Sequence, residues 1–427
     1  MERLVYQQFK EWKNSPSRKP LVLNGARQVG KTWLLQTFAK QEYAKSAYFM
    51  CRKNAFLRQI FAQDIDVDRI LRALRALSGV DITPGDTLII LDEVQDIPEA
   101  LEALKAFREQ APQYHIAVAG SLLGLALHAD FSYPVGQVDT IEIYPMSFEE
   151  FLLAKGEQPL VSLLRNGDYE TLAPLHEHCI ELLRQYFFVG GMPEVVNAYV
   201  QTDSLQDVRA LQTEILRGYD KDFSKHAPID MVARIRMVWQ SIPSQLFKEN
   251  KKFIYGTLRK GARAKDFELA IQWLCDAGLA YRVCRVSKLS MPIRAYEEPS
   301  NFKLYLSDIG LLGAMMDVDP KQILLDDSGF VEYKGGMTEQ YVLQQMKAAG
   351  FTYVGYHSAD TSRLEIDFLI QKEGKLVPIE VKAARNVRSN SLTTLLQSRS
   401  DLHAIRYSLR PYIRQEQMTN IPLYNCP

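Results

Sequence analysis

The sequence predicts an α/β protein of several domains, and three stretches carry that prediction. A glycine-rich loop separates a short apolar strand at residues 21–23 from a helix. A second apolar strand, at 88–91, ends in two acidic residues, and residues 365–382 form the pattern of a β-hairpin with one charged face. Because 427 residues exceed one ordinary hydrophobic core, we expect two to four domains.

The glycine-rich loop matches the phosphate-binding pattern G-x-x-x-x-G-K-[ST] in its required setting of strand, loop and helix. Backbone N–H groups of such a loop surround nucleotide phosphates at a helix N-terminus. Lys31 would reach the β- and γ-phosphate oxygens, and Thr32 would bind Mg²⁺. We therefore expect ATP and Mg²⁺ as cofactors. The predicted ATP-binding residues are Gly25, Ala26, Arg27, Gln28, Val29, Gly30, Lys31, Thr32 and Asp92.

The acidic strand end supplies what hydrolysis needs beyond binding. Asp92 is expected to contribute to the Mg²⁺ shell, and Glu93 to orient and activate the attacking water. A third strand, at 115–121, places Ser121 at its carboxyl end, where open α/β sheets bind ligands. Ser121 is therefore a candidate γ-phosphate sensor. The alternatives are a solvated Glu93 and a helix-capping Ser121.

Several blocks of the sequence resemble a family of predicted AAA-type ATPases of bacteria and archaea that carry a carboxyl-terminal domain of unknown function. These blocks are LNGARQVGKTWLL, LIILDEVQ, VAGSLLG, IYPMSFEEFL, GGMPEVV, YDKDFSK, GARAKDFELAIQWLCDAGLAYRV and FKLYLSDIGLL. The resemblance implies an AAA-type ATP-binding domain over 1–150 and a helical lid over 151–225. Such ATPases need an arginine near the γ-phosphate. Gln137 stands where the family commonly has a basic residue, so Arg27 or an arginine from a second copy in a homo-oligomer is expected to serve.

The expected order of elements over 226–325, three helices and then two strands, is that of a winged-helix domain. The second of these helices is expected at 253–260. Basic residues crowd the segment 248–265, with Phe253 and Tyr255 between them, a pattern suited to DNA phosphate contacts. The alternatives are a solvated charged surface and a protein-docking module. The basic residues are Lys248, Lys251, Lys252, Arg259, Lys260, Arg263 and Lys265.

The hairpin at 365–382 has like charges on one face. With Glu373 and Gly374 as its turn, alternation and counting place Asp367 opposite Glu380 and Glu365 opposite Lys382. Directly opposed Cβ atoms are about 5 Å apart, so two carboxylates there are destabilising unless a cation lies between them. The pattern therefore predicts a metal ion or a basic partner.

A helix is expected upstream of the hairpin, after a Gly-Gly break, with Thr338 as its candidate cap and Glu339 on its apolar face. Glu339, Asp367, Glu380 and Lys382, in that order, resemble the active site of the PD-(D/E)xK nuclease fold, here over 326–427. The resemblance implies a second Mg²⁺ or Mn²⁺ bound by Asp367 and Glu380, with Lys382 stabilising charge on a phosphodiester. The alternative is a ladder of salt bridges in which Glu365 pairs with Lys382.

Composition limits the class of protein. The formal net charge is zero, so DNA binding must come from a local patch. Five scattered cysteines without a C-x-x-C pair favour a reducing cytoplasm, and no apolar run approaches the ~18 residues of a membrane span.

The sequence therefore predicts a cytoplasmic Mg²⁺-dependent ATPase that couples hydrolysis to a DNA-binding carboxyl-terminal module, with DNA cleavage left open. The alternative is a slow ATP-gated switch that docks DNA or a protein partner without cutting. A chaperone-like remodeller is favoured if the segment 248–265 is buried.

Overall fold

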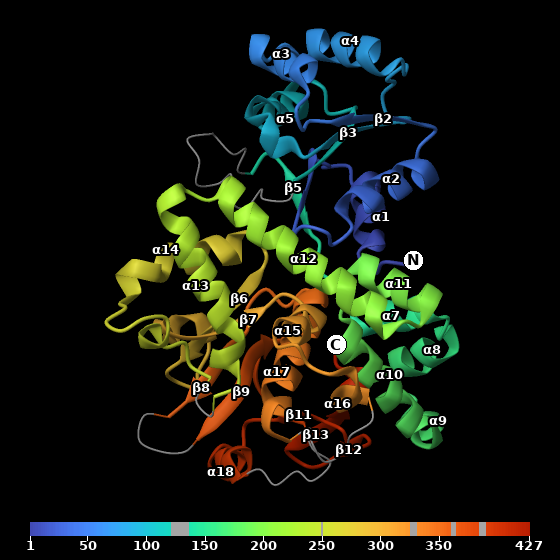
Figure 1. Ribbon diagram of the computed structural model, residues 1–427. Coiled ribbons are helices and arrows are strands. Elements are labelled where there is room, and N and C mark those ends of the chain that lie inside the picture. The colour runs from blue at the N-terminus through green and yellow to red at the C-terminus, as the bar shows by residue number, and fades with distance from the viewer. Residues whose placement is uncertain (121–135, 249–250, 325–330, 360–363, 384–389) are drawn as a thin grey trace. The chain divides into compact units, whose positions relative to one another are not determined.

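A computed structural model describes residues 1–120, 136–248, 251–324, 331–359, 364–383 and 390–427 (Figure 1). The chain divides into two compact units. The first comprises Glu2–Tyr144 with Asp276–Gly278, and the second comprises Pro145–Cys275 and Leu279–Pro427 together with Met1. Each unit is described by itself.

The first unit is built on a parallel five-stranded sheet in the order β2-β3-β4-β1-β5. Its central strands are continuous apolar runs, as expected for a parallel sheet covered by helices on both faces. This confirms the predicted α/β character of the amino-terminal part. The elements are α1 (Tyr6–Asn14), β1 (Leu21–Asn24), α2 (Lys31–Glu42), β2 (Lys45–Met50), α3 (Ala55–Gln63), α4 (Val67–Ser78), β3 (Thr87–Asp92), η1 (Val94–Asp96), α5 (Pro98–Gln110), β4 (His115–Ala119) and β5 (Asp139–Glu142).

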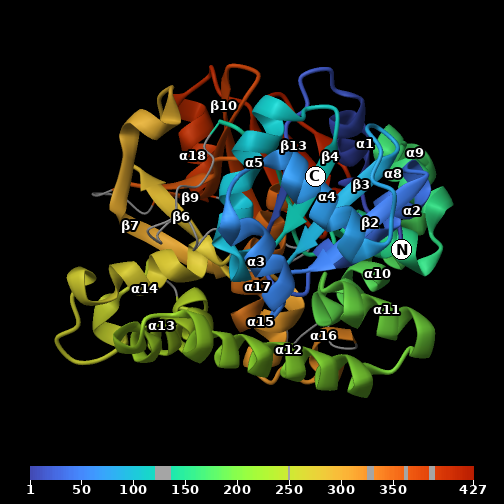
Figure 2. The same ribbon diagram turned by 90° about the horizontal axis from the view of Figure 1, so that it is seen from above.

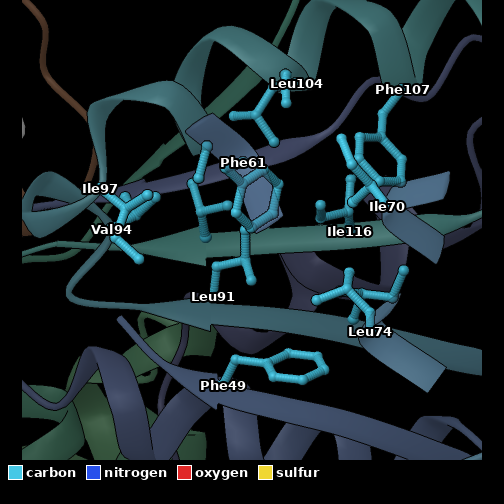
Figure 3. Close-up of a cluster of buried hydrophobic side chains, with 14 of the residues drawn as sticks. Phe49, Phe61, Ile70, Leu74, Leu91, Val94, Ile97, Leu104, Phe107 and Ile116 are labelled. Carbon is cyan, nitrogen blue, oxygen red and sulfur yellow. The ribbon is translucent and has the colours of Figure 1, made fainter. Parts of the chain in front are cut away.

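A hydrophobic cluster fixes the strand that ends in Asp92. Figure 3 shows Leu91 of β3 and Ile116 of β4 packed against side chains of α3, α4 and α5, among them Phe61 and Phe107. These four side chains are almost fully buried. Burying one such side chain contributes about 1.5–3 kcal/mol. The position of the Asp92 carboxylate is therefore set by the core and not by its loop.

The second unit begins with a helical region, as the sequence predicts for 151–225. Figure 2 shows the long helix α12 running on from α11 and followed by α13 and α14. The helices are α7 (Phe148–Lys155), α8 (Gln158–Asn166), α9 (Tyr169–Leu172), α10 (His176–Val189), α11 (Pro193–Thr202), α12 (Leu205–His226), α13 (Ile229–Leu246), α14 (Ala264–Asp276), α15 (Ile309–Met315), α16 (Pro320–Leu324), α17 (Val331–Ala348) and α18 (Asn390–Ser398).

An eight-stranded mixed sheet forms the rest of this unit, in the order β12-β13-β11-β10-β9-β8-β6-β7. The predicted hairpin is present: Lys372 pairs with Lys375 and Phe368 with Ile379, and Glu373 and Gly374 form the turn with φ values of 51° and 72°. The strands are β6 (Ala280–Val286), β7 (Glu297–Leu306), β8 (Gly355–Ser358), β9 (Glu365–Lys372), β10 (Lys375–Lys382), β11 (Ala404–Ser408), β12 (Ile413–Arg414) and β13 (Met418–Pro422).

The helix expected at 253–260 does not form, and that prediction was wrong. The segment has one 3₁₀ turn, Tyr255–Thr257. Phe253 is buried and stacks on Phe302 of β7 at 5.3 Å between ring centroids, and its N–H donates to the Phe302 carbonyl. This packing holds the chain extended beside β7. A strand pair follows α14 as predicted, although residues 293–296 form a 3₁₀ helix and β7 begins only at Glu297. Strands β6 and β7 belong to the same sheet as the hairpin and do not form a separate wing.

The Gly-Gly pair before Glu339 is not a helix break. Helix α17 begins at Val331 and runs through Gly335 and Gly336, so Thr338 is an interior residue and not a cap. A Cβ atom on Gly336 would lie 2.8 Å from the Phe247 ring and 2.9 Å from the Leu246 carbonyl oxygen. The glycine therefore allows α17 to approach the end of α13 closely.

A buried polar network joins α17 to two of the sequence blocks that the family resemblance singled out. The Asp308 carboxylate accepts hydrogen bonds from the Gly191 N–H at 2.6 Å, the Leu311 N–H at 2.9 Å and the Gln344 amide at 3.1 Å. Gln344 in turn accepts from the Ile309 N–H at 2.8 Å. The blocks GGMPEVV and FKLYLSDIGLL therefore have a structural role, because their polar backbone groups are satisfied here.

No disulfide links the five cysteines. None of the helices in the described part of the chain combines the length and the apolar character that crossing a membrane requires.

Candidate functional site

The predicted phosphate-binding loop lies between β1 and α2, and its backbone requires glycine. Gly25 has φ +136° and Gly30 has φ +92°. A Cβ atom on Gly25 would lie 2.1 Å from the carbonyl oxygen of Ile143. A side chain at this position would therefore displace the loop from the strand end beside it.

The side chain of Lys31 folds over this loop. Its Nζ donates to the carbonyl oxygens of Gly25 at 2.8 Å and Ala26 at 2.6 Å. Burial lowers the pKa of Lys31 to about 8, although nearby carboxylates, Glu93 first among them, act in the opposite direction. A buried ammonium group is stabilised by an anion, and nucleotide phosphates supply that charge.

Asp92, at the carboxyl end of β3, meets the first turn of α2. Its Oδ2 accepts hydrogen bonds from Thr32 Oγ1 at 2.6 Å and from the Tyr48 hydroxyl at 2.9 Å. Hydroxyl and carboxylate oxygens are the ligands that Mg²⁺ prefers. Thr32 and Asp92 therefore fit the metal that the phosphate loop implies. Tyr48 was not predicted from the sequence.

Glu93 follows Asp92 with a left-handed backbone, at φ +55°. The side-chain amide of Gln95 donates to Glu93 Oε2 at 2.6 Å, so the direction of the carboxylate is fixed by a neighbour two residues along. The Gln95 Oε1 atom is buried and has no hydrogen-bond partner among the residues that the structure describes. The pair can hold a carboxylate base next to the Asp92 group, as hydrolysis requires.

Arg3 connects the loop to the strand end that supports it. Its Nη1 donates to the Val29 carbonyl at 2.9 Å and its Nη2 to the Tyr144 carbonyl at 2.7 Å, and the side chain is buried. The sequence offered no signal for this residue, because it precedes the loop and belongs to no motif. Arg3 is therefore a positioning residue for the loop.

A second group of charges surrounds Glu339 on α17. Lys251 forms an ion pair with Glu339 Oε1, the Tyr305 hydroxyl donates to Oε2 at 2.9 Å, and Lys303 Nζ lies 3.7 Å from Oε2. Burial by itself would raise the pKa of Glu339, but the two lysines hold it below its usual range. Glu339 faces the interior, as its helical spacing predicts.

Asp367 lies beside this group on β9. Burial, and then the charge of Glu339, raise the pKa of Asp367. Its Oδ2 accepts a hydrogen bond from the Val381 N–H of β10 at 2.8 Å. The neighbouring Glu365 pairs with Lys303 at 2.8 Å and not with Lys382, so that predicted pairing was wrong.

Glu380 has its own cations. Arg406 Nε of β11 donates to Glu380 Oε2 at 2.8 Å, and Lys382 Nζ lies 3.2 Å from Oε1. The predicted nuclease-like residues thus divide into two groups. In one, Glu339 is ion-paired by Lys251 and Lys303 beside Asp367; in the other, Glu380 is ion-paired by Lys382 and Arg406. Over the described residues, no set of three or more His, Cys, Asp or Glu side chains is placed to hold a metal ion.

Comparison with known families agrees with the geometry of the loop. Residues 17–152 match the family described as AAA domain. The amino-terminal unit carries an AAA-type P-loop ATPase domain. Residues 180–322 and 334–426 match two domains of unknown function, DUF8612 and DUF4143. No curated protein is significantly similar to the chain.

Several solved structures match the chain at low similarity. The Walker-type ATPase PABY2304 of Pyrococcus abyssi is 14% identical, with a TM-score of 0.46 over 73% of this chain and 94% of that chain. The Orc1 protein of Aeropyrum pernix, solved in complex with DNA, is 11% identical, with a TM-score of 0.28 over 74% of this chain and 93% of that one. Scores this low carry no argument about function.

Two predicted features of the AAA-type domain stay predictions. Ser121 lies outside the described residues. Gln137 accepts a hydrogen bond from Arg108, and the positive charge of Arg27 lies close enough to Lys31 to lower its pKa. Arg27, one of the two predicted candidates for the γ-phosphate arginine, therefore lies near the Lys31 ammonium group.

The basic segment 248–265 divides into a packed and an exposed part. Lys251 is paired with Glu339, and Phe253 is a core residue, so neither presents a free surface. The Tyr255 hydroxyl donates to Glu268 at 2.8 Å. The two aromatic residues that lie between the basic ones in the sequence are therefore engaged in contacts within the protein. The exposed basic residues are Arg259, Lys260, Arg263 and Lys265.

Replacing Arg3 with methionine is expected to weaken ATP binding about 5- to 30-fold, because the Val29 carbonyl loses its buried donor and the loop loosens by about 1–2 kcal/mol. Equilibrium binding of a fluorescent ATP analogue measures this. Arg18→Met is the matched control, because Arg18 also donates to two backbone carbonyls, those of Lys13 and Pro112, away from the loop. Equal losses in the two variants would refute a specific role for Arg3.

Proposed function

We propose that the chain is an Mg²⁺-dependent ATPase whose nucleotide cycle controls a DNA-binding carboxyl-terminal part. The observation that carries the ATPase proposal is the hydrogen bond between Thr32 and Asp92 beside a buried Lys31. This hydrogen bond joins the first turn of α2, which follows the loop, to the end of β3. The proposed division is an ATPase domain at 1–150, a lid at 151–225, a middle part at 226–325 whose strands join the sheet of the hairpin, and a nuclease-like part at 326–427.

Each residue of the loop region has a proposed task. The backbone N–H groups of 26–31 and the Lys31 ammonium bind the phosphates. Thr32 and Asp92 would hold Mg²⁺, which when bound neutralises phosphate charge. Glu93, held by Gln95, accepts the proton of the attacking water.

Two further residues complete the proposed γ-phosphate site. Ser121 is proposed to contact the γ-phosphate. We propose that an arginine, either Arg27 or one from a second copy of the chain, stabilises the charge that develops there.

DNA binding is proposed for the exposed basic residues Arg259, Lys260, Arg263 and Lys265. They lie within seven consecutive positions that end in the first turn of α14. The net charge of the whole chain is zero, so any attraction to phosphate is local. Each phosphate neutralised contributes about −0.9 to the slope of log affinity against log salt. Replacing all four with glutamine should reduce that slope by about 3 to 4.

The experiment measures ATP turnover with and without duplex and single-stranded DNA, for the native protein and for Lys31→Ala. We expect turnover that depends on Mg²⁺, rises with DNA and is lost in Lys31→Ala. Lys40→Ala is the control, because Lys40 lies exposed in the last turn of the same helix. Turnover that survives in Lys31→Ala would refute the ATPase assignment.

The second candidate is a slow ATP-gated switch that docks DNA or a protein partner without cleaving it. The ion pairing of Glu339 and Glu380 by lysine and arginine side chains favours docking over cleavage. ATP turnover that does not respond to DNA, together with DNA or protein binding that depends on ATP, would select the switch.

A further inference from the structure

We infer that Lys251 and Lys303 take the place of the divalent cation in the nuclease-like carboxylate site, which makes this site a metal-independent junction and not a nuclease centre. The inference concerns the second unit alone and does not depend on the ATPase proposal. The starting point is the pair Asp367 and Glu380, which the sequence predicts to lie opposite each other in the hairpin. Two carboxylates in such positions need positive charge nearby. In the nuclease fold that the sequence resembles, a metal ion provides this charge. In this chain, lysine and arginine side chains provide it.

Lys303 is the central cation of the site. It is 1% exposed on β7, with its Nζ 2.8 Å from Glu365 Oε1 and 3.7 Å from Glu339 Oε2. Burial by itself would lower the pKa of Lys303, but the two carboxylates outweigh burial and hold the pKa above its ordinary value. A fully buried ammonium group requires such partners, because an unpaired one is strongly destabilising. Glu339 and Glu365 therefore serve as the counter-ions of the buried Lys303 ammonium group.

Lys251 closes the other side of Glu339. It forms an ion pair with Oε1, while the Tyr305 hydroxyl donates to Oε2. Both carboxylate oxygens of Glu339 thus have protein donors. A metal ion would have to displace these donors and would then lie against two ammonium groups, at a distance where like charges repel strongly in a buried site.

Glu380, on β10, is likewise held by two cationic side chains. Arg406, itself 8% exposed, donates to one oxygen at 2.8 Å, and Lys382 lies 3.2 Å from the other. Mg²⁺ requires near-octahedral oxygen ligands at about 2.0–2.1 Å. Of the two carboxylates predicted to bind this metal, that of Glu380 is held by Arg406 and Lys382, and that of Asp367 accepts a hydrogen bond from the Val381 N–H at 2.8 Å.

The junction also joins parts of the chain that lie far apart in sequence. Lys251 and Glu339 are 88 residues apart, and Lys303 and Glu365 are 62 residues apart. The ion pairs therefore fix the segment at 251–255 and strand β7 to helix α17 and strand β9. These charged residues therefore contribute to holding the fold together, a role that requires no catalysis.

The first test compares Mn²⁺ binding to the full-length, nucleotide-free native protein and to Asp367→Asn, by titration calorimetry and by thermal unfolding. We expect the same number of Mn²⁺ ions and the same shift in Tm for both proteins. Loss of a Mn²⁺ site in Asp367→Asn would overturn the inference. Plasmid incubated with Mg²⁺ or Mn²⁺ should stay intact, and cleavage that disappears in Asp367→Ala would overturn it as well.

The second test removes the resident cations. Lys251→Met and Lys303→Met should each lower Tm, and Mn²⁺ should restore part of the loss, because the carboxylates then lack a counter-ion. Adding Asp367→Asn to either variant should reduce this restoration. Lys375→Met is the control, because Lys375 is an exposed lysine of the same sheet and its loss should not create a response to Mn²⁺.

If Lys303→Met does not fold, Lys251→Met still provides the test. Lys251 is partly exposed and lies outside the strands, so we expect this variant to fold. Absence of any response to Mn²⁺ in the lysine variants would overturn the inference, because the lysines would then not occupy the place of a cation. ATP hydrolysis, measured in the same preparations, should be unchanged by Asp367→Asn. A loss of hydrolysis in Lys31→Ala alone concerns the ATPase proposal and leaves this inference standing.

Discussion

Replacing Glu93 with glutamine is expected to leave ATP binding intact and to lower the rate of hydrolysis about 10²- to 10⁴-fold. A glutamine side chain has the shape of glutamate but cannot accept the proton of the attacking water, and a positioned base contributes a factor of this size. The Asp92 carboxylate, with its donors Thr32 and Tyr48, is untouched by the change, so Mg²⁺ and ATP should still bind. Binding of an ATP analogue and single-turnover hydrolysis measure the two effects separately.

Glu109→Gln is the matched control for Glu93→Gln, because Glu109 lies exposed in the last turn of α5 in the same unit. It should leave both binding and hydrolysis unchanged. If Glu93→Gln retains turnover within about twofold of the native protein, another group activates the water. In that case Gln95, which contacts Glu93 at 2.6 Å, becomes the first residue to replace.

The nucleotide site could be predicted because its signals are local. Gly25, Gly30, Lys31 and Thr32 lie within eight consecutive positions, and their backbone conformation follows from their own residue types. Asp92 is recognised because a buried strand must end where the apolar run ends. Arg3 and Tyr48 were missed because tertiary packing alone brings them to the site. Arg3 reaches a carbonyl 26 positions away, and Tyr48 a carboxylate 44 positions away.

At the carboxyl-terminal site, too, local sequence signals could not identify the residues that tertiary packing brings together. Alternation and turn chemistry predicted the register of the hairpin and the need for a cation near Asp367. They could not identify that cation, because Lys251 and Lys303 come from the preceding part of the chain. The helix expected at 253–260 failed for a related reason: the packing of Phe253 on Phe302 overrides local helix propensity.

Replacing Asp308 with alanine is expected to destabilise the second unit by about 3 kcal/mol or more. The carboxylate is fully buried, and its loss leaves the N–H groups of Gly191 and Leu311 without their acceptor. Each buried donor left unpaired costs about 1–3 kcal/mol. Urea unfolding followed by tryptophan fluorescence measures the change, and Trp239 and Trp273 report on this unit.

One further variant separates the hydrogen bonds of Asp308 from its charge, and another, at Asp319, is the matched control. Asp308→Asn keeps one side-chain acceptor and should cost less than Asp308→Ala. Asp319→Ala, an exposed aspartate before α16 that accepts from the Lys321 N–H at 2.8 Å, should cost about 1 kcal/mol, the typical value of a cap. If Asp308→Ala costs no more than Asp319→Ala, the buried donors find other acceptors, and the network does not hold α17.

The Asp308→Ala variant also separates ATP hydrolysis from its proposed coupling to DNA. Asp308 belongs to the second unit, whereas Lys31, Asp92 and Glu93 belong to the first. Hydrolysis without DNA should therefore persist in Asp308→Ala at temperatures where the protein is folded. Stimulation by DNA should fall, because the network that holds α17 against the residues around 191 and 308 is loosened. Equal loss of basal and stimulated turnover would mean that Asp308 supports the stability of the whole chain and has no separate part in coupling.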